Sequence, residues 1–337
     1  MRYTQFFSEI RQNKIAPCYV FEGEEEYIKQ QALIALEKVL VPETFKDLNK
    51  NILQNPNIAE LIDTVETLPF MAEKRLVIVN ECTSLSSAKA KDDDFVADFL
   101  AYLPTISPST CLVFVVRGKA DGRKKLYSAL KKKQAIVDFS PMNDQECVDW
   151  VKKILNNQNI NITHAVAQKL VFTVGHDASL LKQELSKLES YLQDRNTVLE
   201  EDVNNICTKS SEYTVFQMVD AQVAGQLSVA LELLGTMLHN GENSIAILAM
   251  LLRQYRILYH MSCLVKEGVA NAQLASLLGI PPFTIARTKQ QTSRYSTEKL
   301  KQAYFYLLQL EYELKTGITS QDGCAETSLL VLSNILQ

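Results

Sequence analysis

Four short apolar runs, separated by segments with helical periodicity, most constrain what the first 141 residues can fold into. They are residues 18–22, 75–79, 111–116 and 135–139. Continuous apolar strands that alternate with helices are typical of a parallel sheet covered on both faces. Ser140 and Pro141 then interrupt the pattern. The sequence therefore predicts an α/β domain over residues 1–141.

The rest of the chain is predicted to be helical. Residues 142–211 are expected to form a small helical lid without strands. Its helix-start signals are Asn143 or Asp144, Thr163 and Asp177. Residues 212–337 carry long segments with one apolar face, which predict a separate helical domain. Only 11 glycines occur in 337 residues, and this low usage disfavours β-hairpins and glycine-rich loops.

A nucleotide-binding fold would carry its phosphate loop directly after the first strand, and the motif of that loop is absent. Residues 23–26 read Gly-Glu-Glu-Glu. Three carboxylates repel a triphosphate, and no lysine or hydroxyl is in register to hold phosphate or magnesium. Asn80 and Glu81 replace the acidic pair of an active ATPase. We therefore expect no cofactor, no metal and no catalytic residues.

Charge, cysteine usage and hydropathy indicate the cellular location and the partners of the protein. The formal net charge of −4 gives no global attraction to nucleic acid. Seven widely spaced cysteines without a Cys-x-x-Cys pair are typical of reduced thiols. The first residues lack the apolar segment of a signal peptide, and no apolar run approaches membrane-spanning length. These features predict a soluble cytoplasmic protein without a membrane partner.

An apolar loop tip is predicted between a helix and the second apolar run. An Asn-x-x-Glu start signal at residues 57–60 is followed by apolar residues at helical spacing, and Leu68 continues this stripe. Pro69 cannot extend the helix, so Phe70 and Met71 are carried off its end. They either fold back as a lid on the core, as most phenylalanines would, or form an apolar plug for a pocket on another protein.

Two further segments bear on nucleic acid. Residues 123–133 are rich in lysine and arginine; such a helix face is usually solvated, and phosphate contact is the alternative. Residues 274–289 have the pattern of a helix-turn-helix with Gly279 at the turn. Because the motif is weakly specific, a structural role in a bundle is favoured. The competing function is that of a helix-turn-helix DNA-binding regulator.

Several segments, taken in order and spacing, resemble the delta subunits of the bacterial DNA polymerase III clamp loader over essentially the whole chain. They are residues 21–24, 66–79, 174–177, 183–188, 215–221, 252–256 and 277–283. The resemblance implies an α/β plus all-α protein: an AAA+-like sheet domain (1–141) without a functional phosphate loop, a helical lid domain (142–211) and a helical collar domain (212–337) that joins a five-member ring.

In this family the subunit is non-catalytic: it binds the sliding clamp and opens it for loading onto primed DNA. No ATPase or nucleotidyltransferase activity of its own is implied, although it is part of the DNA polymerase III holoenzyme. The family's hydrophobic plug matches Leu68, Pro69, Phe70 and Met71. A Leu-Phe pair is common there, whereas Pro69 directly precedes Phe70 here. Whether Leu68 or Met71 is the second anchor is therefore left open.

The resemblance also implies the partners. They are the sliding clamp (beta subunit), other clamp-loader subunits of the gamma/tau and delta-prime types, and primer-template DNA within the complex. Candidate DNA contacts are Lys119, Arg123, Lys124 and the loop that follows Lys315.

Overall fold

The computed structural model describes residues 1–86, 93–193 and 195–337. Contacts within the chain divide it into two units. The first is Met1–Met142 with Asp177–Ser179, and the second is Asn143–His176 with Leu180–Gln337. The division into three domains at residues 141 and 211 stays a prediction. Within the described residues, no helix has both the length and the apolar character needed to cross a membrane.

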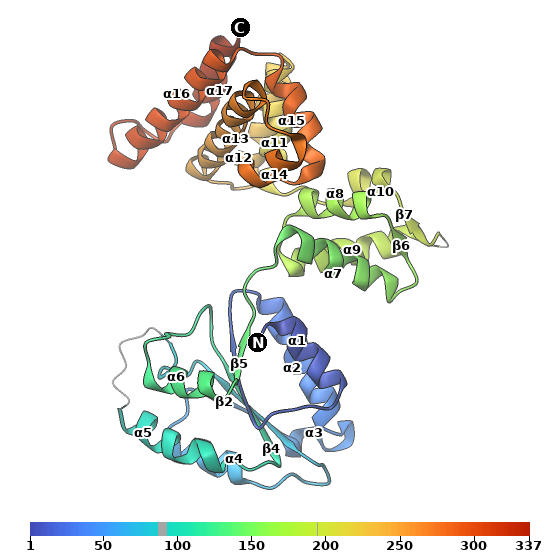
Figure 1. Ribbon diagram of the computed structural model, residues 1–337, viewed down its shortest axis with the longest axis vertical. Helices are drawn as coiled ribbons and strands as arrows, with labels where there is room; N and C mark the ends of the chain where they lie inside the picture. The colour runs from blue at the N-terminus through green and yellow to red at the C-terminus, as the bar shows by residue number, and fades with distance from the viewer. Residues whose placement is uncertain (87–92, 194) are drawn as a thin grey trace. The chain divides into compact units, whose positions relative to one another are not determined.

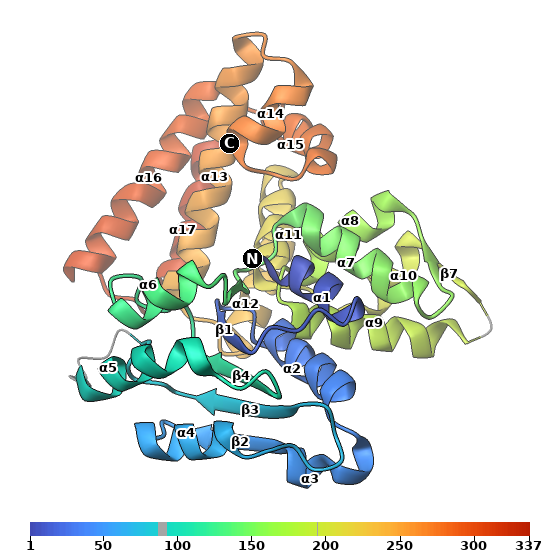
Figure 2. The same ribbon diagram turned by 60° about the horizontal axis from the view of Figure 1, so that its bottom comes forward.

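The first unit is built on a five-stranded parallel sheet in the order β2-β3-β4-β1-β5 (Figures 1 and 2). Its strands are β1 (Cys18–Glu22), β2 (Lys50–Gln54), β3 (Arg75–Asn80), β4 (Thr110–Val115) and β5 (Ile136–Asp138). The strands predicted at the four apolar runs are confirmed. Their side chains are buried on both faces of the sheet, which is why the runs are continuously apolar.

Helices cover both faces of this sheet. One face packs against α4 (Ile58–Glu66), α5 (Asp93–Tyr102) and α6 (Lys125–Lys132). Val77 and Val79 of β3 share this core with Leu61 of α4. On the other face lie α1 (Tyr3–Arg11) and α2 (Glu26–Leu40), and the ring of Phe6 meets the ring of Phe21 edge to face at 5.0 Å between centroids. The unit is thus a three-layered, AAA+-like sheet domain.

Strand β2, at the edge of the sheet, was not predicted from the sequence. It follows a short turn of 3-10 helix, η1 (Glu43–Phe45), and the four-residue helix α3 (Lys46–Asn49). Because only one neighbour, β3, pairs with it, its residues are partly or largely exposed. The sequence Lys-Asn-Ile-Leu-Gln therefore lacks the apolar run that marks the inner strands.

The amino-terminal part of the second unit contains α7 (Asp144–Asn156), α8 (His164–Val174), α9 (Ala178–Leu192) and α10 (Glu200–Ile206). Asn143 caps α7 in a capping box and Thr163 caps α8, as predicted. The prediction that this region lacks strands is wrong, since β6 (Asn161–Ile162) and β7 (Thr197–Val198) pair in parallel. Strands of two residues are too short to show a period of two in the sequence.

The carboxyl-terminal part of the second unit is helical, as predicted, and its helices lie together in Figure 1. They are α11 (Ser211–Val223), α12 (Leu227–His239), α13 (Ser244–Lys266), α14 (Asn271–Leu278), η3 (Pro282–Thr284), α15 (Ile285–Thr292), α16 (Thr297–Thr316) and α17 (Cys324–Leu336). Leu251, Tyr255 and Leu258 of α13 form the centre of the core, together with Leu300 and Leu307 of α16.

Candidate partner-binding site

The candidate site is the loop of residues 67–74 between α4 and β3, which we call the tip. The predicted start of α4 is confirmed, because Asn57 Oδ1 accepts a hydrogen bond from the backbone N–H of Glu60 at 3.0 Å. The helix ends at Glu66. The prediction that Leu68 continues the buried stripe of α4 is therefore wrong. Leu68 lies beyond the end of the helix with 76% of its surface exposed.

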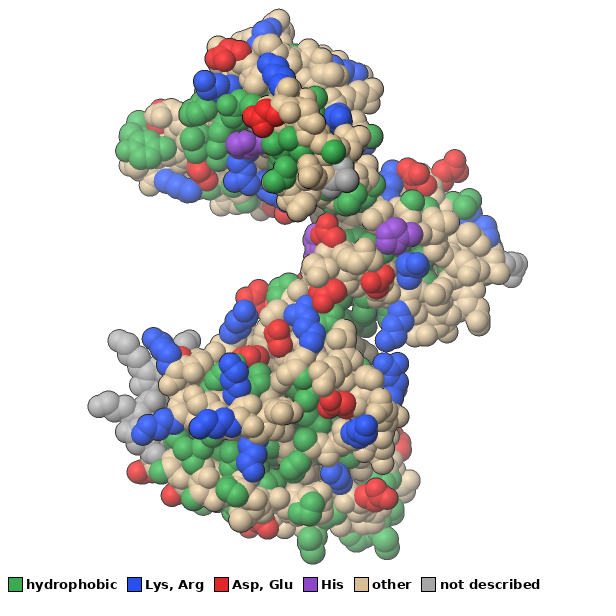
Figure 3. Space-filling model, viewed as in Figure 1, with side chains coloured by type: hydrophobic (Ala, Val, Ile, Leu, Met, Phe, Trp, Pro, Cys, Tyr) green, Lys and Arg blue, Asp and Glu red, His purple; other side chains and the backbone are tan. Residues whose placement is uncertain are grey.

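Large apolar side chains project from the tip into solvent. Met71 is 74% exposed and Phe70 is 49% exposed, while Pro69, between Leu68 and Phe70, is partly buried. A lid folded onto the core would bury these side chains, which is not what the structure shows. Figure 3 shows hydrophobic side chains projecting from the lower edge of the first unit. Such a group of exposed apolar residues is typical of a protein-binding surface.

The backbone of Phe70 is held on both sides by one amide side chain. Asn49, at the end of α3, is fully buried. Its Oδ1 accepts a hydrogen bond from Phe70 N–H at 2.7 Å, and its Nδ2 donates to the Phe70 carbonyl at 2.8 Å. Nδ2 also donates to the carbonyl of Phe45 at 3.0 Å. The amide thus links α3 to the tip.

A second buried side chain holds the beginning of the tip. Arg75, the first residue of β3, donates from one guanidinium nitrogen to the carbonyls of Thr67 and Leu68 at 3.4 and 3.2 Å. Its Nε donates to Asn51 Oδ1 of β2 at 2.9 Å. Because β2 and β3 are paired neighbours, these bonds fix the tip to the amino-terminal edge of the sheet.

Two local features set the direction of the tip side chains. The ring of Phe70 meets the ring of Phe45 at 80° with 5.4 Å between centroids, which accounts for the buried half of its surface. Met71 has a φ of +51°, in the left-handed region that a residue with a side chain rarely adopts. The tip is therefore a defined turn in which the ring of Phe70 packs against Phe45 while Leu68 and Met71 are exposed.

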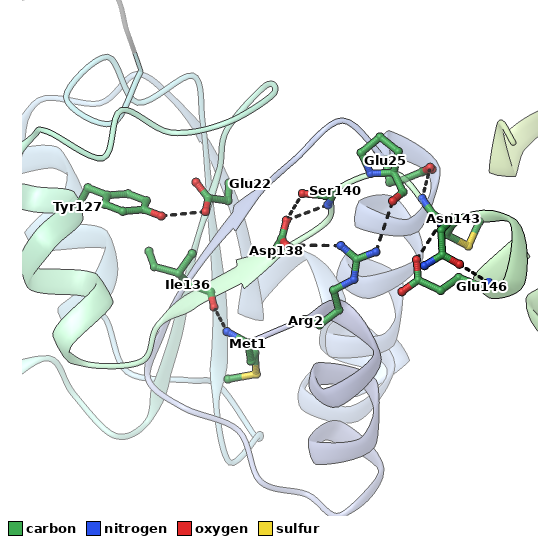
Figure 4. A network of polar contacts seen from close by, with 12 residues as sticks. Met1, Arg2, Glu22, Glu25, Tyr127, Ile136, Asp138, Ser140, Asn143 and Glu146 are labelled. Atoms are coloured by element: carbon green, nitrogen blue, oxygen red, sulfur yellow. Dashed lines mark hydrogen bonds and ion pairs between the residues drawn. The ribbon is translucent and has the colours of Figure 1, made fainter. Parts of the chain in front are cut away.

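The phosphate-loop position at the end of β1 is filled by the chain itself. The N–H of Gly23 donates to the carbonyl of Gly118 at 2.7 Å, and the N–H of Glu25 donates to the carbonyl of Phe139 at 3.0 Å. Glu25 Oε1 accepts a hydrogen bond from the N–H of Met142 at 3.3 Å (Figure 4). A helix binds phosphate through free N–H groups at its first turn. Before α2, the carbonyls of Gly118 and Phe139 already accept hydrogen bonds from two such N–H groups.

The acidic groups around this position also bond within the first unit (Figure 4). Glu22 accepts hydrogen bonds from the Tyr127 hydroxyl at 2.9 Å and from the N–H of Ala120 at 3.0 Å. Burial opposes ionisation of Asp138, but hydrogen bonds from Ser140 and the charge of Arg2 hold its pKa below the ordinary value. These contacts tie the ends of β1 and β5 to neighbouring segments of the first unit.

The candidate DNA-contacting side chains differ in whether they already bond to other groups of the chain. Lys119 is exposed. Arg123 forms a two-bond pair with Asp121, at 2.9 Å for each bond, and Lys124 donates to the carbonyl of Thr83 at 2.9 Å. Lys315, in the second unit, is paired with Glu311 of the same helix at 2.9 Å. Contact of these residues with DNA stays a prediction.

The helix-turn-helix pattern is present as α14 and α15, with Gly279 at the turn in the left-handed conformation. Its apolar residues form a small core with Met261 of α13. Arg287 pairs with Asp220 of α11 and lies over the ring of Phe216 at 5.1 Å. Because this cation is engaged within its own unit, the motif has the contacts of a structural element.

Asn49, Arg75 and Phe45 were not singled out from the sequence. Arg75 starts a predicted strand, but no sequence signal assigns its side chain to the carbonyls of the preceding loop. Asn49 and Phe70 are 21 residues apart, and the strand that brings them together, β2, was itself missed. A buried polar residue next to an edge strand has no periodicity that would reveal it.

Comparisons with known proteins agree with this architecture. A family model described as DNA polymerase III, delta subunit, matches residues 19–140, and one for the C-terminal domain of the DNA polymerase III delta subunit matches residues 212–332. A middle-domain model matches residues 143–205. DNA polymerase III subunit delta of Bacillus subtilis is 28% identical over 331 residues, which are 97% of this chain and 95% of that protein.

A solved structure, the DNA clamp loader delta protein of Bacillus subtilis, is similar over 98% of this chain and 99% of that chain, with 26% identity and a TM-score of 0.57. The fold and the matches define a protein of the clamp-loader class, built on an AAA+-like sheet domain. Within that class, the chain belongs to the family of DNA polymerase III delta subunits. A clamp-loader role in DNA replication follows from this membership.

Proposed function

We propose that this chain binds the sliding clamp through Leu68, Pro69, Phe70 and Met71 and opens the ring for loading onto primed DNA. The observation that carries the proposal is the tip: exposed apolar side chains on a loop whose backbone is bonded to buried groups on both sides. Aromatic anchors on ordered backbone are typical hot spots of protein interfaces. Leu68, Pro69, Phe70 and Met71 have no acidic, basic or nucleophilic side chain, so the role we propose for them is binding.

Burial of the exposed tip side chains would release enough free energy to support binding to another protein. Burying one phenylalanine and one or two aliphatic side chains contributes about 2 to 3 kcal/mol each, before the cost of association. Phe70 is already about half buried, with its ring against that of Phe45, so Leu68 and Met71 have the larger exposed fractions left to bury. Binding favours an open ring only if the tip contacts the open clamp better than the closed one.

Nucleotide hydrolysis is proposed to reside in other subunits. The closed phosphate-loop position supports this, since Gly23 and Glu25 bond to the chain's own carbonyls. Clamp-loader subunits of the gamma/tau and delta-prime types would supply the nucleotide-driven change, in the cytoplasm and on primer-template DNA. Among the candidate DNA contacts, Lys119 has an exposed side chain, whereas Arg123, Lys124 and Lys315 bond to other groups of the chain.

The test is calorimetric titration of the full chain with the sliding clamp of the same organism. Phe70→Ala should weaken binding by at least about 30-fold, the size of a hot-spot truncation. Phe305→Ala is the matched control, because Phe305 of α16 is 50% exposed and Phe70 is 49% exposed. Both variants should retain the wild-type circular dichroism spectrum.

Equal binding by wild type and Phe70→Ala would contradict the proposal, as would the absence of binding by the wild-type chain. Leu68→Ala and Met71→Ala, measured in the same series, identify the second anchor. The variant with the larger loss of affinity marks the side chain that enters the pocket of the clamp.

A further inference from the structure

We propose that Asn49 is a positioning residue for clamp binding: its buried side-chain amide fixes the backbone of Phe70 and so holds the tip in its binding conformation. This inference rests on the proposed function of the tip. It adds a residue that contributes no exposed surface and that sequence patterns do not identify.

The Asn49 amide bonds to both backbone polar groups of Phe70, as a residue on a neighbouring β-strand would. Asn49 Oδ1 accepts from Phe70 N–H at 2.7 Å, and Nδ2 donates to the Phe70 carbonyl at 2.8 Å. The second hydrogen of Nδ2 is used by the Phe45 carbonyl at 3.0 Å. Both donors of the amide and its acceptor are therefore occupied, which satisfies a fully buried polar group.

No other side chain of this size can make these three bonds. An aspartate at position 49 would set carboxylate oxygens against the carbonyls of Phe70 and Phe45. A leucine has a similar shape but leaves three backbone groups without partners, and glutamine is longer by one methylene. The bonds are thus specific to asparagine.

The tip needs this support because its conformation is locally unfavourable. Met71, directly after Phe70, is in the left-handed region, which costs a residue with a side chain free energy that its surroundings must offset. Leu68 and Met71 make little contact of their own, since about three quarters of each surface is exposed, 76% and 74%. Without Asn49, Phe45 and Arg75 would hold only the ring of Phe70 and the start of the tip.

A tip that must be ordered when the clamp binds pays conformational entropy at that moment, whereas a tip already ordered does not. Fixing the backbone of one residue corresponds to about tenfold in affinity. We therefore expect Asn49→Leu and Asn49→Asp to weaken clamp binding by about tenfold, although the buried side chain of Asn49 would not itself contact the clamp.

The experiment uses the full chain and two measurements. Hydrogen exchange followed by NMR reports the Phe70 amide directly and needs no clamp: its exchange should be slow in the wild type and at least about tenfold faster in Asn49→Leu. Calorimetry with the clamp gives the affinity. The control is Tyr127→Phe, which removes one hydrogen bond, to Glu22, at the carboxyl-terminal edge of the same sheet.

Asn49 acts as proposed if its variants lose both amide protection and affinity while Tyr127→Phe loses neither. A Phe70 amide that exchanges freely in the wild type, or equally in Asn49→Leu, overturns the inference. So does unchanged affinity in folded Asn49 variants when Phe70→Ala is defective. If Phe70→Ala binds as well as wild type, the proposed function fails instead, and the exchange measurement still decides whether Asn49 orders the tip.

Discussion

Gly23 lies against the backbone of Phe139 so closely that a Cβ atom built on Gly23 would be 2.2 Å from the carbonyl carbon of Phe139. Gly23 also has a φ of +124°, a conformation that residues with a side chain rarely adopt. The glycine where a phosphate loop would begin thus serves a different purpose from binding phosphate. It allows the chain after β5 to pack against the end of β1.

Gly23→Ala should therefore destabilise the protein by about 3 kcal/mol or more, because the methyl group meets backbone that cannot move aside cheaply. Urea unfolding measures the loss. Gly122→Ala is the matched control, since the φ of Gly122 is not in the positive range. A Cβ atom built on Gly122 would be 3.8 Å from its nearest neighbour, on the ring of Tyr127. A Gly23→Ala variant as stable as Gly122→Ala would contradict the close packing.

Met71→Gly should make the tip more stable and at the same time a poorer ligand. Glycine adopts the left-handed conformation of this position without steric cost, and the relief is worth up to about 1 kcal/mol. Met71→Ala removes the same apolar surface but keeps the strain. Both should lose clamp affinity if Met71 is the second anchor, while only Met71→Gly gains stability in urea unfolding. Equal stability of the two variants would show that the backbone at Met71 is unstrained.

Asp121 and Arg123 make a pH-dependent contact that NMR titration can follow. Hydrogen bonds from Arg123 lower the pKa of Asp121 to about 2 from an ordinary value of 3.8. Because the folded-state pKa is depressed, the stabilising contribution is complete above pH 3.8 and is lost as the pH falls toward 2. In Arg123→Ala the pKa of Asp121 should return toward 3.8. An unchanged pKa would mean that the pair does not form in solution.

Arg287→Ala should destabilise the second unit by about 2 kcal/mol, because it leaves the largely buried carboxylate of Asp220 without its cation and removes the contact with Phe216. Lys289→Ala is the control, as its side chain makes a single exposed bond to Asn271 at 2.7 Å. Thermal unfolding distinguishes the two. A DNA-binding helix-turn-helix would give the opposite result: duplex binding lost in both variants, with stability unchanged.

The sequence predicted the inner strands and the helix starts because each depends on residues close together in the chain. Buried strands such as β3 and β4 are continuous apolar runs, and a cap such as Asn57 acts three residues from itself. The exit of the tip was predicted for the same reason, since Pro69 stops a helix by its own covalent structure.

What the sequence did not predict depends on neighbours that are distant in the chain. The edge strand β2 is half exposed, so it lacks an apolar run. The bonds from Asn49 to Phe70 and from Arg75 to Leu68 exist only once β2 and β3 are paired. Exposure of Phe70 was likewise undecided, because a phenylalanine at a loop tip packs inward or outward according to contacts such as the one with Phe45.

The backbone hydrogen bonds of Gly23 and Glu25 also bear on when the tip is available for binding. The backbone N–H groups of Gly23 and Glu25 donate to the chain's own carbonyls, so these two groups are not free to bind a nucleotide phosphate. If hydrolysis resides in other subunits, as proposed above, the exposure of the tip does not depend on the ratio of ATP to ADP. Under the proposed function, the moment at which a clamp is held or released would then be set from outside this chain, by something that covers the tip or competes for it.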